Sequence, residues 1–141
     1  MMIRRIAHIC ITAADLDNSR KFYCNVLGMK KVFDFVKDGT VSGFYLDAGD
    51  RTFIEVFRGA PSTEEGKIRH LCLETGNIDA VADALRQSGF PVTDKKKGAD
   101  GSWQIWSADP DGVRIEFHQY TEKSSQLTGE TAVQAEKQKK R

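Results

Sequence analysis

The 141-residue chain lacks both a strong excess of charge and a long apolar run. Its formal net charge is +1, so the composition offers no broad electrostatic reason to expect nucleic acid or a membrane surface as partner. No apolar run approaches the roughly 20 residues that a membrane-spanning helix needs. We therefore expect a soluble protein whose partner is a small molecule.

The chain is also poor in cysteine, with Cys10, Cys24 and Cys72 as its three thiols. An odd number does not make a closed disulfide framework, and the first residues lack the apolar core of a secretory signal. This pattern predicts a cytoplasmic protein with reduced cysteines.

The remaining composition is that of an ordinary globular domain, 40% hydrophobic and 29% charged. The end of the chain differs, because residues 121–141 hold five basic and three acidic residues and no aromatic one. Such a segment cannot bury enough apolar surface to fold alone. We expect one domain over residues 1–120 and a flexible tail over residues 121–141.

One phrase occurs twice in the chain, first as IAHICI and then as IRHLCL. His8 of the first copy lies 47 residues before Glu55, and His70 of the second lies 46 residues before Glu116. Chance can produce one such pair, but a second pair at nearly the same spacing indicates duplication. The sequence thus predicts two similar modules, about residues 3–60 and 66–120, with a pseudo-twofold site.

Hydrophobic periodicity predicts the same order of elements in both modules. In the first module we expect strands and a helix at residues 3–12, 15–27 (helix), 29–37, 41–48 and 52–57. In the second we expect them at residues 69–74, 78–88 (helix), after Pro91, and at 103–107 and 113–120. The predicted fold class is α+β, with two tandem βαβββ modules forming a curved, cup-shaped sheet whose helices lie on the outer face.

Alternation along the strands assigns the ionisable residues to one face. Glu55 lies between Ile54 and Val56, and Glu116 lies between Ile115 and Phe117, so each glutamate points away from the apolar, helix-covered side. His8 and His70 alternate with apolar neighbours in the same way. All four should therefore line the concave face.

Buried imidazoles and carboxylates are costly unless they are paired, hydrogen-bonded or bound to a cation. Any one of these residues alone is best explained as an ordinary polar contact, whereas His8, Glu55, His70 and Glu116 in repeat register favour one divalent metal ion, with Zn, Ni, Co, Fe and Mn all suitable. Cys72, like Cys10, lies two residues along a strand from its histidine, a displacement of about 6.6 Å. We expect both cysteines to pack or line the pocket.

The chain resembles the vicinal oxygen chelate superfamily, which includes glyoxalase I, methylmalonyl-CoA epimerase, extradiol dioxygenases, and fosfomycin and bleomycin resistance proteins. The resemblance covers about residues 3–120 and rests on IAHICI, DLDNSRKFYCNVLGM, FIEVF, IRHLCL and SADPDGVRIEFHQY. It implies metal ligands on the first and last strands of each module, which are His8, Glu55, His70 and Glu116. This ligand set is most similar to that of glyoxalase I, since epimerases often carry Gln at the second place.

Two positions depart from the glyoxalase pattern for holding glutathione. Thr12 stands where an Arg follows the first histidine, and Gly59 stands where an Asn follows the first glutamate. A substrate other than a glutathione adduct is therefore open, with Arg58, Arg69 and Arg114 as candidates for binding a carboxylate or as solvated residues. The predicted substrate-binding residues are Thr12, Phe53, Phe57, Trp103, Arg114 and His118.

Several of these assignments leave an alternative. Either Trp103 or Trp106 could form the rim of the substrate site, because residues three apart on a strand point to opposite faces and only one of them can face the cup. Aromatic residues on strands are also often part of the core. His118 could assist proton transfer, or it could be solvated at the end of its strand.

The function expected from this resemblance is a metal-dependent, glyoxalase I-like lyase or isomerase. Its small substrate would chelate the metal through vicinal oxygens, with Glu116, or else Glu55, as the proton-transfer base. The alternatives are an iron dioxygenase, an acyl-CoA epimerase and a metal-free drug- or metabolite-binding protein. A homodimer is expected, because pairing of chains protects open sheet edges.

Overall fold

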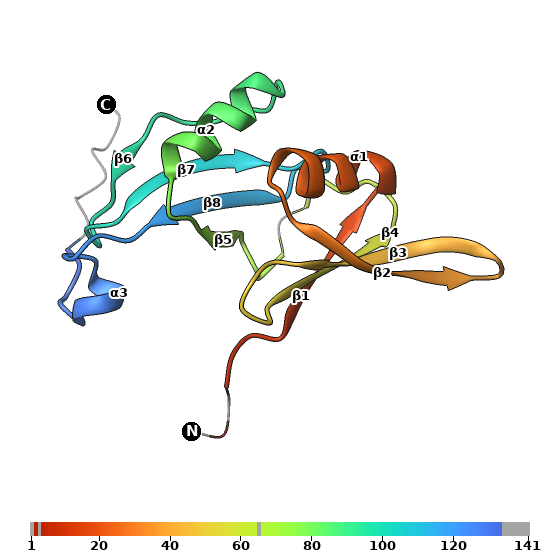
Figure 1. Ribbon diagram of the computed structural model, residues 1–141, viewed down its shortest axis with the longest axis horizontal. Coiled ribbons are helices and arrows are strands. Elements are labelled where there is room, and N and C mark those ends of the chain that lie inside the picture. Colours follow the sequence, from red (N-terminus) through yellow and green to blue (C-terminus); the bar gives the residue numbers. More distant parts are fainter. Residues whose placement is uncertain (1, 3, 65, 134–141) are drawn as a thin grey trace. The chain divides into compact units, whose positions relative to one another are not determined.

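A computed structural model describes residues 2, 4–64 and 66–133 of the chain (Figure 1). It divides into two compact units. The first unit comprises Met1–Arg69 and Ala108–Val113, and the second comprises His70–Ser107 and Arg114–Arg141.

The first unit is one βαβββ module. Its elements are β1 (His8–Ala13), α1 (Leu16–Arg20), the π-helical turn η1 (Lys21–Val26), β2 (Lys30–Lys37), β3 (Thr40–Asp47) and β4 (Phe53–Arg58). They form a four-stranded sheet of order β1-β4-β3-β2, in which β1 and β4 are parallel and the other neighbours antiparallel.

The second unit repeats this order. Its elements are β5 (Leu71–Glu74), α2 (Ile78–Gln87), β6 (Lys96–Lys97), β7 (Trp103–Ala108), β8 (Arg114–Gln119) and the short helix α3 (Ser125–Thr128). The sheet order is β5-β8-β7-β6, again with the first and last strands of the module parallel. The predicted α+β fold of two βαβββ modules is confirmed.

Local signals in the sequence place the helices. Asp15 begins α1, because its side chain accepts hydrogen bonds from the backbone N–H groups of Asp17 and Asn18 at 2.9 and 3.1 Å. Gly28, at φ +76°, ends the helical segment, as the C-terminal glycine of a helix commonly does. The helix predicted over residues 15–27 is present, and its second half has the wider π form.

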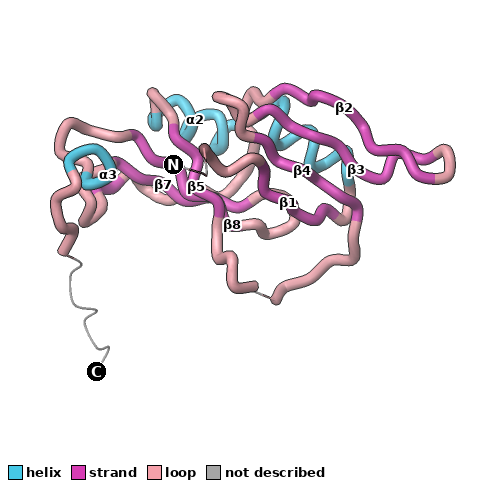
Figure 2. The backbone as a smooth tube through the Cα atoms, turned by 90° about the horizontal axis from the view of Figure 1, so that it is seen from below, coloured by secondary structure: helices cyan, strands magenta, loops and turns pink. Residues whose placement is uncertain are grey.

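In each unit the helix that follows the first strand covers one face of the sheet, and the opposite face is called helix-free below; in the second unit the short helix α3 lies at its end (Figure 1). In the first unit Phe22 and Tyr23 of η1 are fully buried, and on β4 Ile54 and Val56 are buried while Glu55 between them is partly exposed. Figure 2 shows the strands in front of α2 in the second unit, so that the helix-free face is toward the viewer. Strand alternation therefore directs Glu55 and its neighbours of equal parity to the face without a helix.

The start of the expected tail is packed, contrary to the prediction of a flexible segment. Ser124 is fully buried, and the Ser102 hydroxyl donates a hydrogen bond to it at 2.9 Å. Composition did not reveal this turn because polar side-chain hydrogen bonds, not apolar area, hold it to the second unit. Residues 134–141 lie outside the described residues, and none of the described helices has the length and apolar character needed to cross a membrane.

Candidate metal and substrate site

The first unit brings His8 and Glu55 together. His8 begins β1 and Glu55 lies in the middle of β4, and the parallel register sets Cys10 opposite Glu55. His8 Nε2 lies 4.0 Å from Glu55 Oε2, with the imidazole 42% and the carboxylate 20% exposed. The pair is therefore formed within one sheet and remains open to a ligand.

The second unit repeats this pair more tightly. His70 immediately precedes β5, and the register sets Cys72 opposite Glu116, as Cys10 is opposite Glu55. His70 Nε2 lies 3.2 Å from Glu116 Oε2. The repeat in the sequence is thus a repeat in geometry, with one imidazole and one carboxylate on the helix-free face of each sheet.

Glu116 has a second imidazole partner. His118 Nε2–H donates to Glu116 Oε1 at 2.6 Å, so each carboxylate oxygen faces a different histidine. Both His118 and Glu116 are buried, at 7% and 8% exposure. The alternative of a solvated His118 is wrong, because the loop that carries Asp100 covers this end of β8, with Asp100 Oδ2 3.9 Å from His118 Nδ1.

Asp100 extends this network away from the site. Its burial alone would raise the pKa of the carboxyl, but hydrogen bonds from the Gln126 amide and the Ser102 backbone N–H, together with the nearby His118, lower that pKa overall. Sequence reasoning missed Asp100, because it lies on a loop with no periodic pattern.

Cys72 is also closer to the site than strand spacing suggested. Its sulfur and the ligand atoms of Glu116 and His118 all lie within 4.8 Å of one another. Burial, the charge of Glu116 and the charge of Asp100, in that order, raise the pKa of Cys72 to about 12. Spacing along β5 separates Cys72 from His70, but the cross-strand register with β8 sets Cys72 opposite Glu116.

Cys10 has the equivalent place in the first unit. Its pKa is raised by burial and by the hydrogen bond and negative charge of Glu55. Both thiols next to the glutamates are therefore protonated at neutral pH.

The two tryptophans of β7 are separated by strand parity. Trp106 lies beside His70, with ring centroids 4.8 Å apart, and the Arg114 guanidinium lies 4.9 Å from the Trp106 ring. Trp103 instead has the ammonium groups of Lys95 and Lys97 within 4.7 and 4.8 Å of its ring. Trp106, and not the predicted Trp103, therefore lies at the histidine.

Thr12 and Gly59, the positions that depart from the glyoxalase pattern, lie against each other. A Cβ on Gly59 would overlap Thr12 Cγ2, and the Gly59 N–H donates to the carbonyl of Ala13 at 3.1 Å. A larger side chain at residue 59 would therefore require the Thr12 side chain to shift.

Phe53 and Phe57 lie on the Glu55 face as predicted, and further aromatic rings join them there. Tyr45 of β3 pairs with Glu55, and its ring lies 5.7 Å from that of His8. Sequence reasoning missed Tyr45 because the register between β3 and β4 was not readable from the alternation of one strand.

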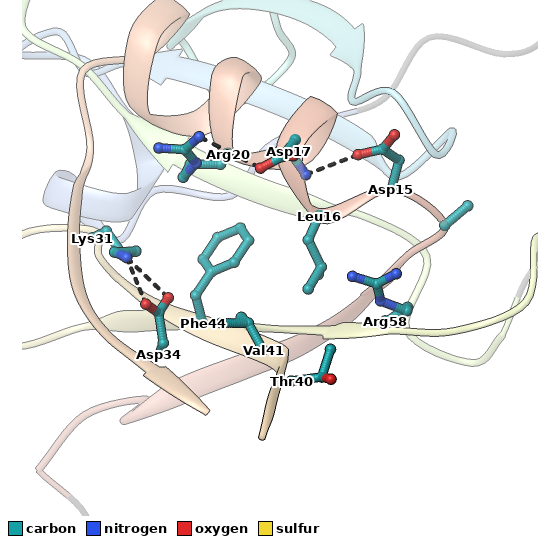
Figure 3. Close-up of a pocket in the computed structure, with 11 residues that line it drawn as sticks. Asp15, Leu16, Asp17, Arg20, Lys31, Asp34, Thr40, Val41, Phe44 and Arg58 are labelled. Atoms are coloured by element: carbon teal, nitrogen blue, oxygen red, sulfur yellow. Dashed lines mark hydrogen bonds and ion pairs between the residues drawn. The ribbon is translucent and has the colours of Figure 1, made fainter. Parts of the chain in front are cut away.

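A hollow of about 480 Å³ lies on the opposite, helix-covered face of the first unit (Figure 3). Arg58 and two ion pairs line it. In these pairs Arg20 lies 3.5 Å from Asp17 and Lys31 lies 2.8 Å from Asp34. Arg58 has the parity of Ile54 and Val56, so it lies away from the glutamate face. None of the predicted metal ligands lines this hollow.

The paired half-sites and the βαβββ order agree with one protein family. The model of the glyoxalase/bleomycin resistance protein/dioxygenase superfamily matches residues 5–117. The chain belongs to this superfamily. It is the vicinal oxygen chelate superfamily, whose members typically bind a divalent metal ion.

Similar proteins within the superfamily differ in their names. YwbC of Bacillus subtilis, an uncharacterized protein, is 32% identical over 84% of this chain and 99% of its own length. A lactoylglutathione lyase of Haemophilus influenzae is 31% identical over 80% of this chain and 90% of its own. The crystal structure of TnmS3, an antibiotic binding protein from Streptomyces, matches with a TM-score of 0.71 at 23% identity, covering 86% and 99% of the two chains. That last likeness shows the shared fold.

Proposed function

We propose that this superfamily member is a metal-dependent lyase or isomerase that moves a carbon-bound proton in a small substrate with two neighbouring oxygens. The observation that supports this proposal is the repetition of one His–Glu pair in both units, on the helix-free face of each sheet. The relatives named lactoylglutathione lyase agree with this class of reaction.

In this proposal His8, Glu55, His70 and Glu116 hold one divalent ion. Two imidazole nitrogens and two carboxylate oxygens are a donor set suited to zinc, nickel, cobalt, iron or manganese. The ion, when bound, supplies a Lewis acid that polarises a substrate oxygen.

Glu116 is the proposed proton-transfer base, and the surroundings of the two glutamates support this choice over Glu55. The residue two positions after Glu116 is His118, which donates to Oε1, whereas the residue two positions after Glu55 is Phe57. A hydrogen bond from outside the metal ligands orients a carboxylate and helps to fix which oxygen faces the reacting atoms. His118 thus acts as a positioning residue for Glu116, which takes a proton from one carbon and returns it to the neighbouring carbon.

Glutathione is not part of the proposed substrate. The glyoxalase pattern has a cationic side chain at the position of Thr12 and an amide side chain at that of Gly59. Here the Thr12 methyl group occupies the space that a side chain on residue 59 would need. The substrate must therefore be held by other surfaces near the histidines.

The first experiment measures metal binding. The full chain, stripped and then offered Ni, Zn, Co, Fe or Mn separately, should retain about one equivalent of at least one of them by elemental analysis. His70→Ala and Glu116→Gln should weaken metal retention by roughly 100-fold or more, since even the loss of a residue that only hydrogen-bonds to a metal ligand costs about 10–100-fold. Glu122→Gln, which removes an exposed carboxylate from the same unit, should bind metal as the original chain does.

Activity is then screened with 2-oxoaldehyde hemithioacetals, acyl-CoA epimers and catechols. Glu116→Gln should keep the far-ultraviolet circular dichroism spectrum of the fold and lose turnover. A chain that holds no metal under any loading condition would contradict the proposal and favour a metal-free binding protein. Oxygen uptake by the iron-loaded chain on a catechol would favour a dioxygenase.

A further inference from the structure

Five aromatic rings gather on the helix-free face of the first unit. We call this surface the aromatic face; it consists of Phe33, Phe35, Tyr45, Phe53 and Phe57. All five come from the three strands β2, β3 and β4, and Glu55 lies among them.

Strand register explains why these rings share one face. Tyr45 is opposite Glu55 across β3 and β4, and Phe33 is opposite Tyr45 across β2 and β3. Side chains directly opposite one another point to the same side of a sheet. Phe33 and Tyr45 therefore form a row that leads to Glu55.

The rings are in mutual contact. Phe33 stacks on Tyr45 with centroids 4.8 Å apart and planes 17° apart, and Tyr45 lies 5.4 Å from Phe53. The ring centroids of Phe35 and Phe57 are 4.7 Å apart. The result is a continuous apolar surface that reaches His8 through Tyr45.

A glycine makes room for the second row. Gly43 is opposite both Phe35 and Phe57, and a Cβ there would lie 2.7 Å from Phe57 Cδ1. The Phe57 ring thus lies over a position that has no side chain.

The aromatic face is distinct from the core of the first unit. The core is on the helix side, where Phe44, Leu46 and Val56 are at most 2% exposed, whereas Phe33 is 44% exposed. Removing apolar surface from water is favourable, so exposed adjoining rings favour an apolar occupant. An aromatic group adds the stacking attraction between rings to this term.

We infer that the substrate carries an aryl group, which stacks on the aromatic face while its two neighbouring oxygens approach the His8–Glu55 pair. This inference rests on the proposed function, because the pair must help to hold the metal ion that the two oxygens would chelate. It adds the substrate class: aromatic compounds with vicinal oxygens, in preference to short aliphatic ones.

The test compares mandelate with lactate, two 2-hydroxy acids that present the same oxygens and differ by a phenyl and a methyl group. Metal content of the full chain is measured first, and each acid is then titrated into the metal-loaded protein by calorimetry. Mandelate should bind about tenfold or more tightly than lactate, a ratio that corresponds to about 1.4 kcal/mol.

Three variants locate the effect. Phe33→Ala and Phe35→Ala should remove most of the preference for mandelate and leave lactate binding unchanged. Lys37→Ala, on the same strand but opposite Thr40 and so on the side of Phe44 and Leu46, is the matched control and should preserve the preference.

The outcomes separate the two proposals. Equal affinities for the two acids, or no binding of either acid to a chain that holds its metal, would overturn the aryl inference and leave the metal site standing. A chain that takes up no metal would overturn both. If Phe33→Ala weakens self-association in light scattering without changing mandelate affinity, a second copy covers the aromatic face and the inference fails.

Discussion

Glu116 illustrates how two copies of one residue pair acquire different surroundings. Glu55 and Glu116 have the same place on their strands, each opposite a cysteine. Only Glu116 has an imidazole on each oxygen, because the residue two positions along its strand is His118 and not a phenylalanine. One substitution on a shared face is enough to distinguish a glutamate held in position from one surrounded by aromatic rings.

The pKa of the Cys72 thiol responds to the negative charge around Glu116. Its pKa of about 12 arises from burial and then from the negative charges of Glu116 and Asp100. Because the thiolate is the reactive form, alkylation by iodoacetamide at pH 8 should be slower than for an unperturbed thiol.

We predict that, in the metal-stripped chain, Glu116→Gln lowers the pKa of Cys72 and speeds its alkylation, measured by mass spectrometry of the peptide that contains it. Cys24, whose raised pKa does not involve Glu116, is the internal control. An unchanged Cys72 rate in the variant would contradict the electrostatic explanation, and a change equal to that of Cys24 would indicate general loosening.

At the scale of elements, the parallel pairing of the first and last strands builds each half-site. β1 pairs with β4 and β5 pairs with β8, so residues 46 or 47 positions apart in the chain come within contact distance. Parallel neighbours need a long crossover connection, and in each module the helix and the intervening strands supply it. The duplicated spacing in the sequence is a direct consequence of this topology.

The turn that contains α3 is a further element of the second half-site. It places Gln126 against Asp100, which lies next to His118. Through this chain of contacts the segment after β8 supports the end of the strand that carries Glu116.

We predict that Gln126→Ala lowers the free energy of unfolding by no more than about 1 kcal/mol at neutral pH, since the lost hydrogen bond is partly exposed. The folded-state pKa of Asp100 is lowered, so its contribution is present above the unfolded-state pKa and is lost as pH falls through the folded value. Urea unfolding at several pH values should show the difference from the original chain shrinking on acidification. A difference that stays constant or grows on acidification would contradict this role for Asp100. Leu127→Ala, which changes an exposed neighbour on α3, is the control for an effect that comes from loss of the turn itself.

At the scale of the whole molecule, the two modules suggest how chains would associate. Each module ends its sheet in a short or exposed edge strand, β6 with two residues in one unit and β2 with mostly exposed residues in the other. Unprotected edges favour pairing with another chain.

We predict a homodimer in solution. Light scattering at micromolar concentration should give a mass near that of two 15.8 kDa chains. A concentration-independent mass of one chain would contradict this prediction. Phe33→Ala should leave the dimer intact if the aromatic face serves the substrate.

The sequence by itself determined the two βαβββ modules, the face on which each glutamate lies, and the pairing of His8 with Glu55 and His70 with Glu116. These follow from periodicity and from a duplicated spacing, both of which are local or repeated patterns. The tertiary structure alone decided the cross-strand neighbours: Tyr45 beside Glu55, Phe33 beside Tyr45, Cys72 beside Glu116, and Trp106 rather than Trp103 beside His70. Register between strands, and the loop and turn that bring Asp100 to His118, depend on packing of segments distant in sequence, which no single strand's alternation encodes.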